Sequence, residues 1–227
     1  MKKVYFISGT MCTIDLWKLV FSRLKYTNFV HIDITSATSF SDINKLIINA
    51  IDAPAIIVGF SLGGFSAMNF AVAYPEMVKE LVVIAANSDA LDQNEIQLRK
   101  STIDFLEQHK YKGVSKHRIQ QFLHPDNYQN ENIISVIKKM DSDLGKKVLI
   151  RQLKATSSRV DISEHVSKLK VPVLFVSAEN DALVSAESIK TTSKTLSKGR
   201  YVCIKNCGHM IPLEKFNELS DIINQFI

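Results

Sequence analysis

Cysteine is scarce in this chain of 227 residues, where it occurs only at Cys12, Cys203 and Cys207. An odd and small number of cysteines does not build a disulfide framework, so we expect reduced thiols and a cytoplasmic location. Cys203, Cys207 and His209 lie close in sequence, but this spacing lacks the second ligand pair of a zinc site. We therefore expect no bound metal.

Long apolar runs are also missing, because none reaches the roughly 18 residues that a membrane-spanning helix requires. The apolar run Val4–Ile7 follows two lysines, as in a signal peptide. It is too short for the apolar region of such a peptide, and no small-residue cleavage site follows it. We interpret this run as the first strand of the mature protein, and we expect no membrane span.

The chain has little excess charge and no repeats or low-complexity tracts. Its net charge is +5, and no basic run with interleaved aromatic residues occurs, so we expect no nucleic-acid partner. Hydrophobic residues make up 46% and charged residues 22%, which is ordinary for a soluble globular protein. The length fits one domain, or one core with an insertion.

Short apolar runs alternate with amphipathic stretches along most of the chain. The runs predict strands at residues 4–7, 29–34, 55–58, 81–85, 173–176 and 200–204. Helices are predicted from Ser41, as N-cap, to 51, over 65–74 and over about 213–226. Strands that alternate with helices favour an α/β fold with a mostly parallel sheet covered on both faces.

The alternation stops once, between about Asn87 and Leu169. This stretch has helical spacing and no strong strand pattern. We therefore predict an α/β core formed by residues 1–87 and 170–227, and a helical cap insertion formed by residues 88–169.

The segment Gly59-Phe60-Ser61-Leu62-Gly63-Gly64 directly follows a predicted strand and precedes a predicted helix. This is the context of a Gly-x-Ser-x-Gly nucleophile elbow, in which a strained turn exposes the serine and the crossing leaves no room for side chains. The N–H of Leu62, at the helix start, is the expected first donor to an oxyanion. The segment does not match Gly-x-Gly-x-x-Gly or a phosphate-binding loop.

A serine needs a base that takes its proton and an acid that orients the base. The predicted strand at 173–176 is followed by Glu179 and Asp181, and the last strand is followed by His209. These residues come in the order serine, acid, histidine, at the carboxyl ends of strands. We predict Ser61 and His209 as catalytic residues, with either Asp181 or Glu179 as the acid.

These motifs resemble those of the α/β-hydrolase family of small cytosolic esterases. Residues 171–181 are similar to the acid loop of that family, which ends in aspartate, so the resemblance implies Asp181 rather than Glu179 as the acid. Residues 207–214 are similar to the family's Gly-His loop. The resemblance implies a sheet of about six strands, because the family's usual earlier strands do not precede residue 4. It also implies a second oxyanion donor, the N–H of Thr10, although Ser8 stands where the family has histidine.

The resemblance implies a serine esterase that cleaves a small acyl ester without a cofactor. Phe60 and Met210 flank the predicted catalytic residues, so we expect them to line an apolar acyl pocket. A non-hydrolytic ligand-binding protein, a lyase or an acyltransferase of the same fold are the alternatives.

The elbow, the compact size and the helical cap are similar to the pimeloyl-carrier-protein methyl ester esterases of biotin biosynthesis. This narrower resemblance implies an acyl carrier protein as partner. Cations of the predicted cap would then meet the acidic carrier, unless they form only a solvated surface. These cations are Arg99, Lys138, Lys139, Lys146, Lys147, Arg151, Lys154 and Arg159.

Overall fold

A computed structural model describes residues 3–25 and 28–227. Residues 1, 2, 26 and 27, which belong to the predicted core, lie outside the described residues. Six parallel strands form one sheet in the order β2-β1-β3-β4-β5-β6, which confirms the predicted fold class and strand number. The strands are β1 (Val4–Ile7), β2 (Phe29–Ile32), β3 (Ala55–Phe60), β4 (Val78–Ile84), β5 (Val173–Ala178) and β6 (Gly199–Ile204).

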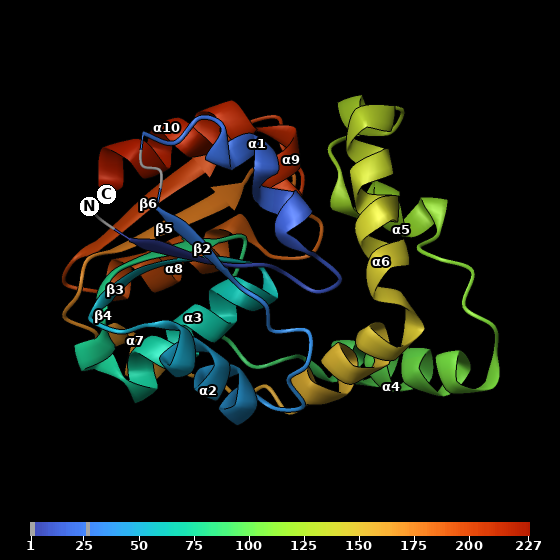
Figure 1. Ribbon diagram of the computed structural model, residues 1–227, viewed down its shortest axis with the longest axis horizontal. Helices are drawn as coiled ribbons and strands as arrows, with labels where there is room; N and C mark the ends of the chain where they lie inside the picture. The colour runs from blue at the N-terminus through green and yellow to red at the C-terminus, as the bar shows by residue number, and fades with distance from the viewer. Residues whose placement is uncertain (1–2, 26–27) are drawn as a thin grey trace.

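Helices cover both faces of the sheet (Figure 1). Side chains alternate along each strand, so that Phe6 and Val58 pack toward α1 (Lys18–Phe21) and α10 (Phe216–Phe226). Tyr5 and Ile57 pack toward α2 (Phe40–Ala50), α3 (Leu62–Ala73) and α8 (Ala186–Thr195). The other helices and 3-10 turns of the core, outside the segment between β4 and β5, are η1 (Ile14–Trp17), η2 (Pro75–Met77) and α9 (Ile211–Glu214).

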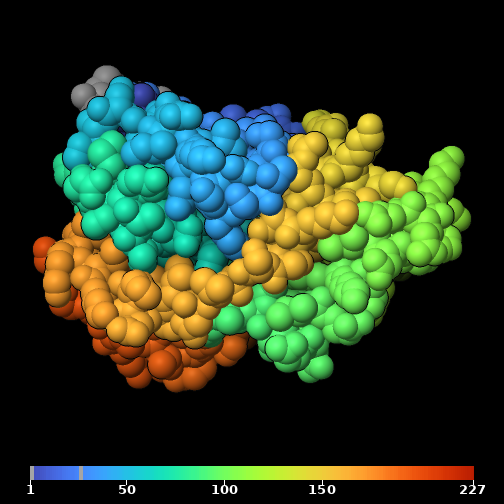
Figure 2. Space-filling model, turned by 90° about the horizontal axis from the view of Figure 1, so that it is seen from below, coloured from blue at the N-terminus to red at the C-terminus, as the bar shows by residue number. Residues whose placement is uncertain are grey.

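The chain between β4 and β5 is helical. It forms α4 (Gln93–Gln108), α5 (Lys116–Phe122), η3 (Pro125–Asn127), α6 (Glu131–Thr156) and α7 (Ser163–Ser167). Helices α4, α5 and α6, here called the cap helices, lie beside the carboxyl ends of the strands (Figure 1), whereas α7 contacts α3 and α8. Figure 2 shows α6, in yellow, against the blue N-terminal part of the core. No helix in the described residues is long and apolar enough to span a membrane.

Several element boundaries differ from the sequence prediction. Helix α2 begins at Phe40 because Ser39, not Ser41, is its N-cap and accepts the Asp42 N–H at 3.1 Å. Helix α3 begins at Leu62, directly after the elbow, rather than at residue 65. The predicted C-terminal helix is two helices, because the backbone at Lys215 (φ −134°, ψ 41°) interrupts it.

The crossing from β3 into α3 brings two stretches of backbone unusually close together. A Cβ atom on Gly63 would lie 2.2 Å from the carbonyl oxygen of Ile7, and one on Gly59 would lie 2.3 Å from the carbonyl oxygen of Gly63. Because backbone atoms of the sheet cannot give way, both positions require glycine. The spacing of the glycines in the motif therefore reflects contact between α3 and the central strands.

We expect Gly63→Ala to destabilise the protein by about 3 kcal/mol, because the added methyl group forces α3 away from β1. Ala73→Gly, at the exposed end of the same helix, also changes one methyl group and should cost only about 0.5–1 kcal/mol. Urea unfolding of both variants measures the difference. Equal losses would contradict the steric explanation.

Candidate active site

Ser61 sits between β3 and α3 with a backbone conformation that L-residues rarely adopt (φ 52°, ψ −116°). Its N–H donates to the carbonyl oxygen of Ile84 at 2.8 Å, and its own carbonyl accepts the N–H of Phe65 at 3.0 Å. These two bonds hold the strained turn between β4 and the first turn of α3. The hydroxyl is thereby presented at the carboxyl edge of the sheet, as expected for an elbow.

The structure brings Ser61, His209 and Asp181 into one hydrogen-bonded line. The Oγ atom of Ser61 lies 3.0 Å from Nε2 of His209, and Nδ1 of His209 lies 2.8 Å from Oδ2 of Asp181. The His209 and Asp181 side chains are only 5% and 1% exposed. Since an ionised carboxylate only accepts, Nδ1 carries the proton and Nε2 is free to accept the serine proton.

The second carboxylate oxygen of Asp181 is also held in place. Oδ1 accepts the N–H groups of Leu183 at 2.8 Å and Val184 at 3.1 Å. Glu179, the rival acid, accepts the N–H of Asn206 at 3.2 Å and makes no contact with His209 in the described part of the chain. The geometry thus favours Asp181 as the partner of the histidine.

Glu214 fixes the loop that carries His209, a contact that the sequence analysis did not assign. One carboxylate oxygen accepts the Gly208 N–H at 3.0 Å, and the other accepts the His124 N–H at 2.7 Å and Nδ2 of Asn127 at 2.9 Å. Burial raises the pKa of the Glu214 carboxyl above its usual value. The histidine loop and the segment after α5 are therefore joined through one side chain.

The two predicted oxyanion donors lie just after the carboxyl ends of two neighbouring strands. Leu62 is the first residue of α3, and Thr10 follows β1, which pairs with β3. Across residues 3–25 and 28–227, neither backbone N–H has a protein acceptor. Both groups are thus available to a ligand, and their role as an oxyanion hole stays a prediction.

Ser8, which replaces the family's histidine, is supported by a hydrogen-bonded cluster that the sequence did not reveal. Its hydroxyl donates to the Thr13 carbonyl at 3.1 Å and accepts from Nε1 of Trp17 at 3.0 Å. Because its single proton is thus used, the contact with Nε2 of His31 at 2.9 Å requires the tautomer in which Nε2 carries the proton. Burial lowers the pKa of His31. An imidazole from β2 and an indole from η1 thus brace the loop that carries Thr10.

The two residues predicted to line an acyl pocket are buried in the core cluster beneath the site. The ring of Phe60 lies 5.1 Å from the ring of His209, centroid to centroid, and so packs against the imidazole. Met210 donates its N–H to the Phe122 carbonyl at 3.1 Å. Contact of either side chain with an acyl group stays a prediction.

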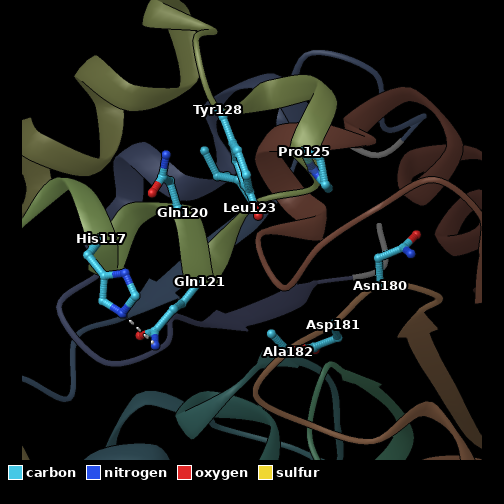
Figure 3. A pocket seen from close by; sticks show the side chains of 9 residues that line it. All are labelled: His117, Gln120, Gln121, Leu123, Pro125, Tyr128, Asn180, Asp181 and Ala182. Atoms are coloured by element: carbon cyan, nitrogen blue, oxygen red, sulfur yellow. Dashed lines mark hydrogen bonds between the residues drawn. The ribbon is translucent and has the colours of Figure 1, made fainter.

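An open cleft of about 520 Å³ separates α5 from the acid loop (Figure 3). Its walls carry the neutral polar side chains of Gln120, Gln121, Tyr128 and Asn180, and it reaches Asp181 from the cap side.

The described residues contain no group of three or more His, Cys, Asp or Glu side chains placed to hold a metal ion. Burial also raises the pKa of the Cys12 thiol to about 12.

Comparison with known proteins gives one family and several named relatives. Residues 37–216 match the sequence profile of the family described as serine aminopeptidase, S33. The chain is 25% identical over 182 residues to a pimeloyl-[acyl-carrier protein] methyl ester esterase of Neisseria meningitidis, covering 78% of this chain and 70% of that protein. It is 27% identical over 164 residues to the enzyme of the same name from Wigglesworthia glossinidia brevipalpis, covering 69% and 62%.

Solved structures agree in fold at low sequence identity. A thermophilic esterase from Thermogutta terrifontis superposes with a TM-score of 0.89 at 16% identity, over 99% of this chain and 89% of that chain. The enol-lactonase from Burkholderia xenovorans LB400 superposes with a TM-score of 0.87 at 13% identity, over 100% and 91%. Identities this low establish a shared fold only.

We expect Asp181→Asn to lower kcat for ester cleavage by about 10³–10⁴-fold, because an amide no longer fixes the Nδ1–H tautomer of His209. Glu179→Gln, which changes the neighbouring carboxyl in the same way, should alter kcat by less than about threefold. Steady-state kinetics of the two variants decide between the acids. A larger loss in Glu179→Gln would reverse the assignment.

Proposed function

Because the chain belongs to the α/β-hydrolase family described as serine aminopeptidase, S33, we propose that it cleaves a carboxylic ester through an acyl-enzyme on Ser61. Its curated relatives and its neighbours in fold include hydrolases of esters. The observation that carries the proposal is the line of hydrogen bonds from Asp181 through His209 to Ser61. Each of these residues follows a different strand, and all three meet at one sheet edge.

In the first half of the reaction, Oγ of Ser61 attacks the ester carbonyl carbon while its proton moves to Nε2 of His209. The carbonyl oxygen becomes an oxyanion, and the N–H groups of Thr10 and Leu62 stabilise its charge. The imidazolium, oriented by Asp181, then donates its proton to the departing alkoxide. An alcohol leaves, and the acyl group remains on the serine.

In the second half, a water molecule replaces the alcohol. His209 takes one proton from this water, whose oxygen attacks the acyl carbon and forms a second oxyanion. When that intermediate collapses, the bond to Oγ breaks and His209 returns the proton to Ser61. The acid is released and the starting state is restored, so no external cofactor enters the balance.

The finer form of the proposal is that the ester is the methyl ester of a pimeloyl group on an acyl carrier protein, in biotin synthesis. The names of the relatives from Neisseria meningitidis and Wigglesworthia glossinidia brevipalpis support this substrate. A carrier protein requires a surface on the cap, and its acidic character calls for unpaired cations there.

Most cations of the cap are engaged within the molecule. For example, Lys139 pairs with Asp15 and Asp143, and Lys154 pairs with Glu107. Arg99, Lys146, Arg151 and Arg159 also donate to groups of this chain. Of the eight cations predicted to meet a carrier, Lys138 and Lys147 are exposed and have no partner among the described residues. Within the predicted set of eight, the proposed carrier contact therefore rests on these two side chains.

A fluorophosphonate probe should label Ser61 and not Ser8, because Ser61 is paired with a base that Asp181 orients, whereas the Ser8 hydroxyl is buried and donates to the Thr13 carbonyl. Ser61→Ala should lose the label and lower kcat for p-nitrophenyl butyrate by about 10⁴-fold or more. Ser66→Ala, one turn further along α3, is the matched control and should keep both. Peptide mass spectrometry and product analysis read the result, and hydrolysis at the wild-type rate by Ser61→Ala would refute the proposal.

For the carrier substrate, we expect kcat/KM to exceed that for the same pimeloyl methyl ester on a small thiol. Lys138→Glu combined with Lys147→Glu should raise KM for the carrier-linked ester about tenfold through charge repulsion, and leave the small ester unchanged. Lys198→Glu, before β6 at the opposite edge of the sheet, serves as control. Without a preference for the carrier, the finer proposal fails while the esterase assignment stands.

A further inference from the structure

The loop after β1 contains a tight turn in a strained conformation. The N–H of Cys12 donates to the carbonyl oxygen of Gly9 at 3.2 Å, which closes a four-residue turn around Thr10 and Met11. Met11 has φ 55°, whereas Thr10 has no positive φ. A positive φ at the third residue alone is the pattern of a type II turn, which favours glycine at that position. A methionine there needs support from outside the turn.

The peptide between Thr10 and Met11 is held at both ends. The buried thiol of Cys12, which burial keeps protonated, donates to the Thr10 carbonyl oxygen at 3.4 Å. The N–H of Met11 donates to Oε1 of Gln152 in α6 at 2.9 Å. This central peptide is the one whose orientation differs between type I and type II turns. If it turned over, the Thr10 carbonyl would point toward the cap helices and the N–H away from them.

Gln152 has a side chain that packing alone does not explain. The residue is 2% exposed, and its Nε2 group is buried without a hydrogen-bond partner among the described residues. An apolar side chain of the same length would fill this space without leaving an N–H group unpaired. The contact that distinguishes glutamine from such a residue is the one from Oε1 to Met11.

We propose that Gln152 is a positioning residue that holds the oxyanion loop in its competent conformation from the cap side. The inference rests on the proposed function, in which the Thr10 N–H stabilises the oxyanion. By accepting the Met11 N–H, Gln152 keeps the turn in the type II state and the Thr10 carbonyl turned away. Oxyanion stabilisation at the Thr10 N–H thereby depends on the side-chain amide of Gln152.

Other contacts hold α6 on the core independently of Gln152. Lys139 lies 2.8 Å from Asp15, and Nη1 of Arg151 donates to the Thr35 carbonyl at 3.1 Å. Loss of the Gln152 amide therefore leaves the cap docked. Arg151, the neighbour of Gln152 in sequence, offers a matched control, because its contact joins cap and core away from the Met11 turn.

The decisive test replaces Gln152 by methionine, which has a similar length but no amide acceptor. We expect Gln152→Met to lower kcat about 10- to 100-fold, with KM changed less than about threefold, because the loss falls on the oxyanion. The Ki of a trifluoromethyl ketone, which forms a tetrahedral oxyanion on the serine, should rise by the same factor. Arg151→Ala should change kcat and Ki less than about threefold.

A second substitution separates positioning from packing. Glycine adopts a positive φ without strain, so Met11→Gly in the Gln152→Met background should restore most of the lost kcat. A pure packing defect in the cap would not respond to a change at position 11. Amide hydrogen exchange of the protein labelled with ¹⁵N-methionine gives a direct readout, since Met11 should lose protection in Gln152→Met.

The outcomes are distinguishable. Loss of kcat, a matching rise in Ki and rescue by Met11→Gly support the proposal. An unchanged kcat and Ki in Gln152→Met, an equal loss in Arg151→Ala, or failure of the rescue overturns it. Fluorophosphonate labelling of Ser61 in the unsubstituted protein is measured in parallel, because absence of that label defeats the esterase assignment itself.

Discussion

The N–H of Ser61 donates to the Ile84 carbonyl. The chain then passes so close to β1 that a Cβ atom at position 63 would collide with the Ile7 carbonyl. The rest of the site depends on this crossing. It imposes the positive φ on Ser61 and directs the hydroxyl toward His209. Because the contact is with β1, the loop that carries Thr10 necessarily lies beside the serine.

The cap helices are joined to both loops that flank the serine. Through Glu214, the segment after α5 shares a carboxylate with the Gly208 N–H, one residue before His209. Through Gln152, α6 accepts the Met11 N–H, one residue after Thr10. The cap is thus a structural support of the loops that carry His209 and Thr10, as well as a wall of the cleft in Figure 3. Its packing and the proposed chemistry are linked through two side chains.

Departures from the family pattern are offset by groups from distant parts of the chain. Ser8 is too short to brace its loop alone, and Trp17 and His31 supply the two donors that complete its hydrogen bonds. Likewise, the cap is rich in lysine and arginine, but most of these cations stabilise contacts within the molecule. Charge in sequence therefore overestimates the charge that is open to a partner.

The order of elements, the elbow, and the succession of serine, acid and histidine could be predicted from the sequence, because apolar periodicity and glycine spacing are local properties. The sequence distinguishes Asp181 from Glu179 only through the family resemblance. The two carboxyls are two residues apart, and the conformation of the loop decides which of them reaches His209. The roles of His31 and Gln152 are invisible in the sequence, because their partners lie 23 and 141 residues away, and Glu214 joins the nearby Gly208 to His124, which is 90 residues away. Only the tertiary structure, which sets the strand order and docks α6, brings these side chains to the site.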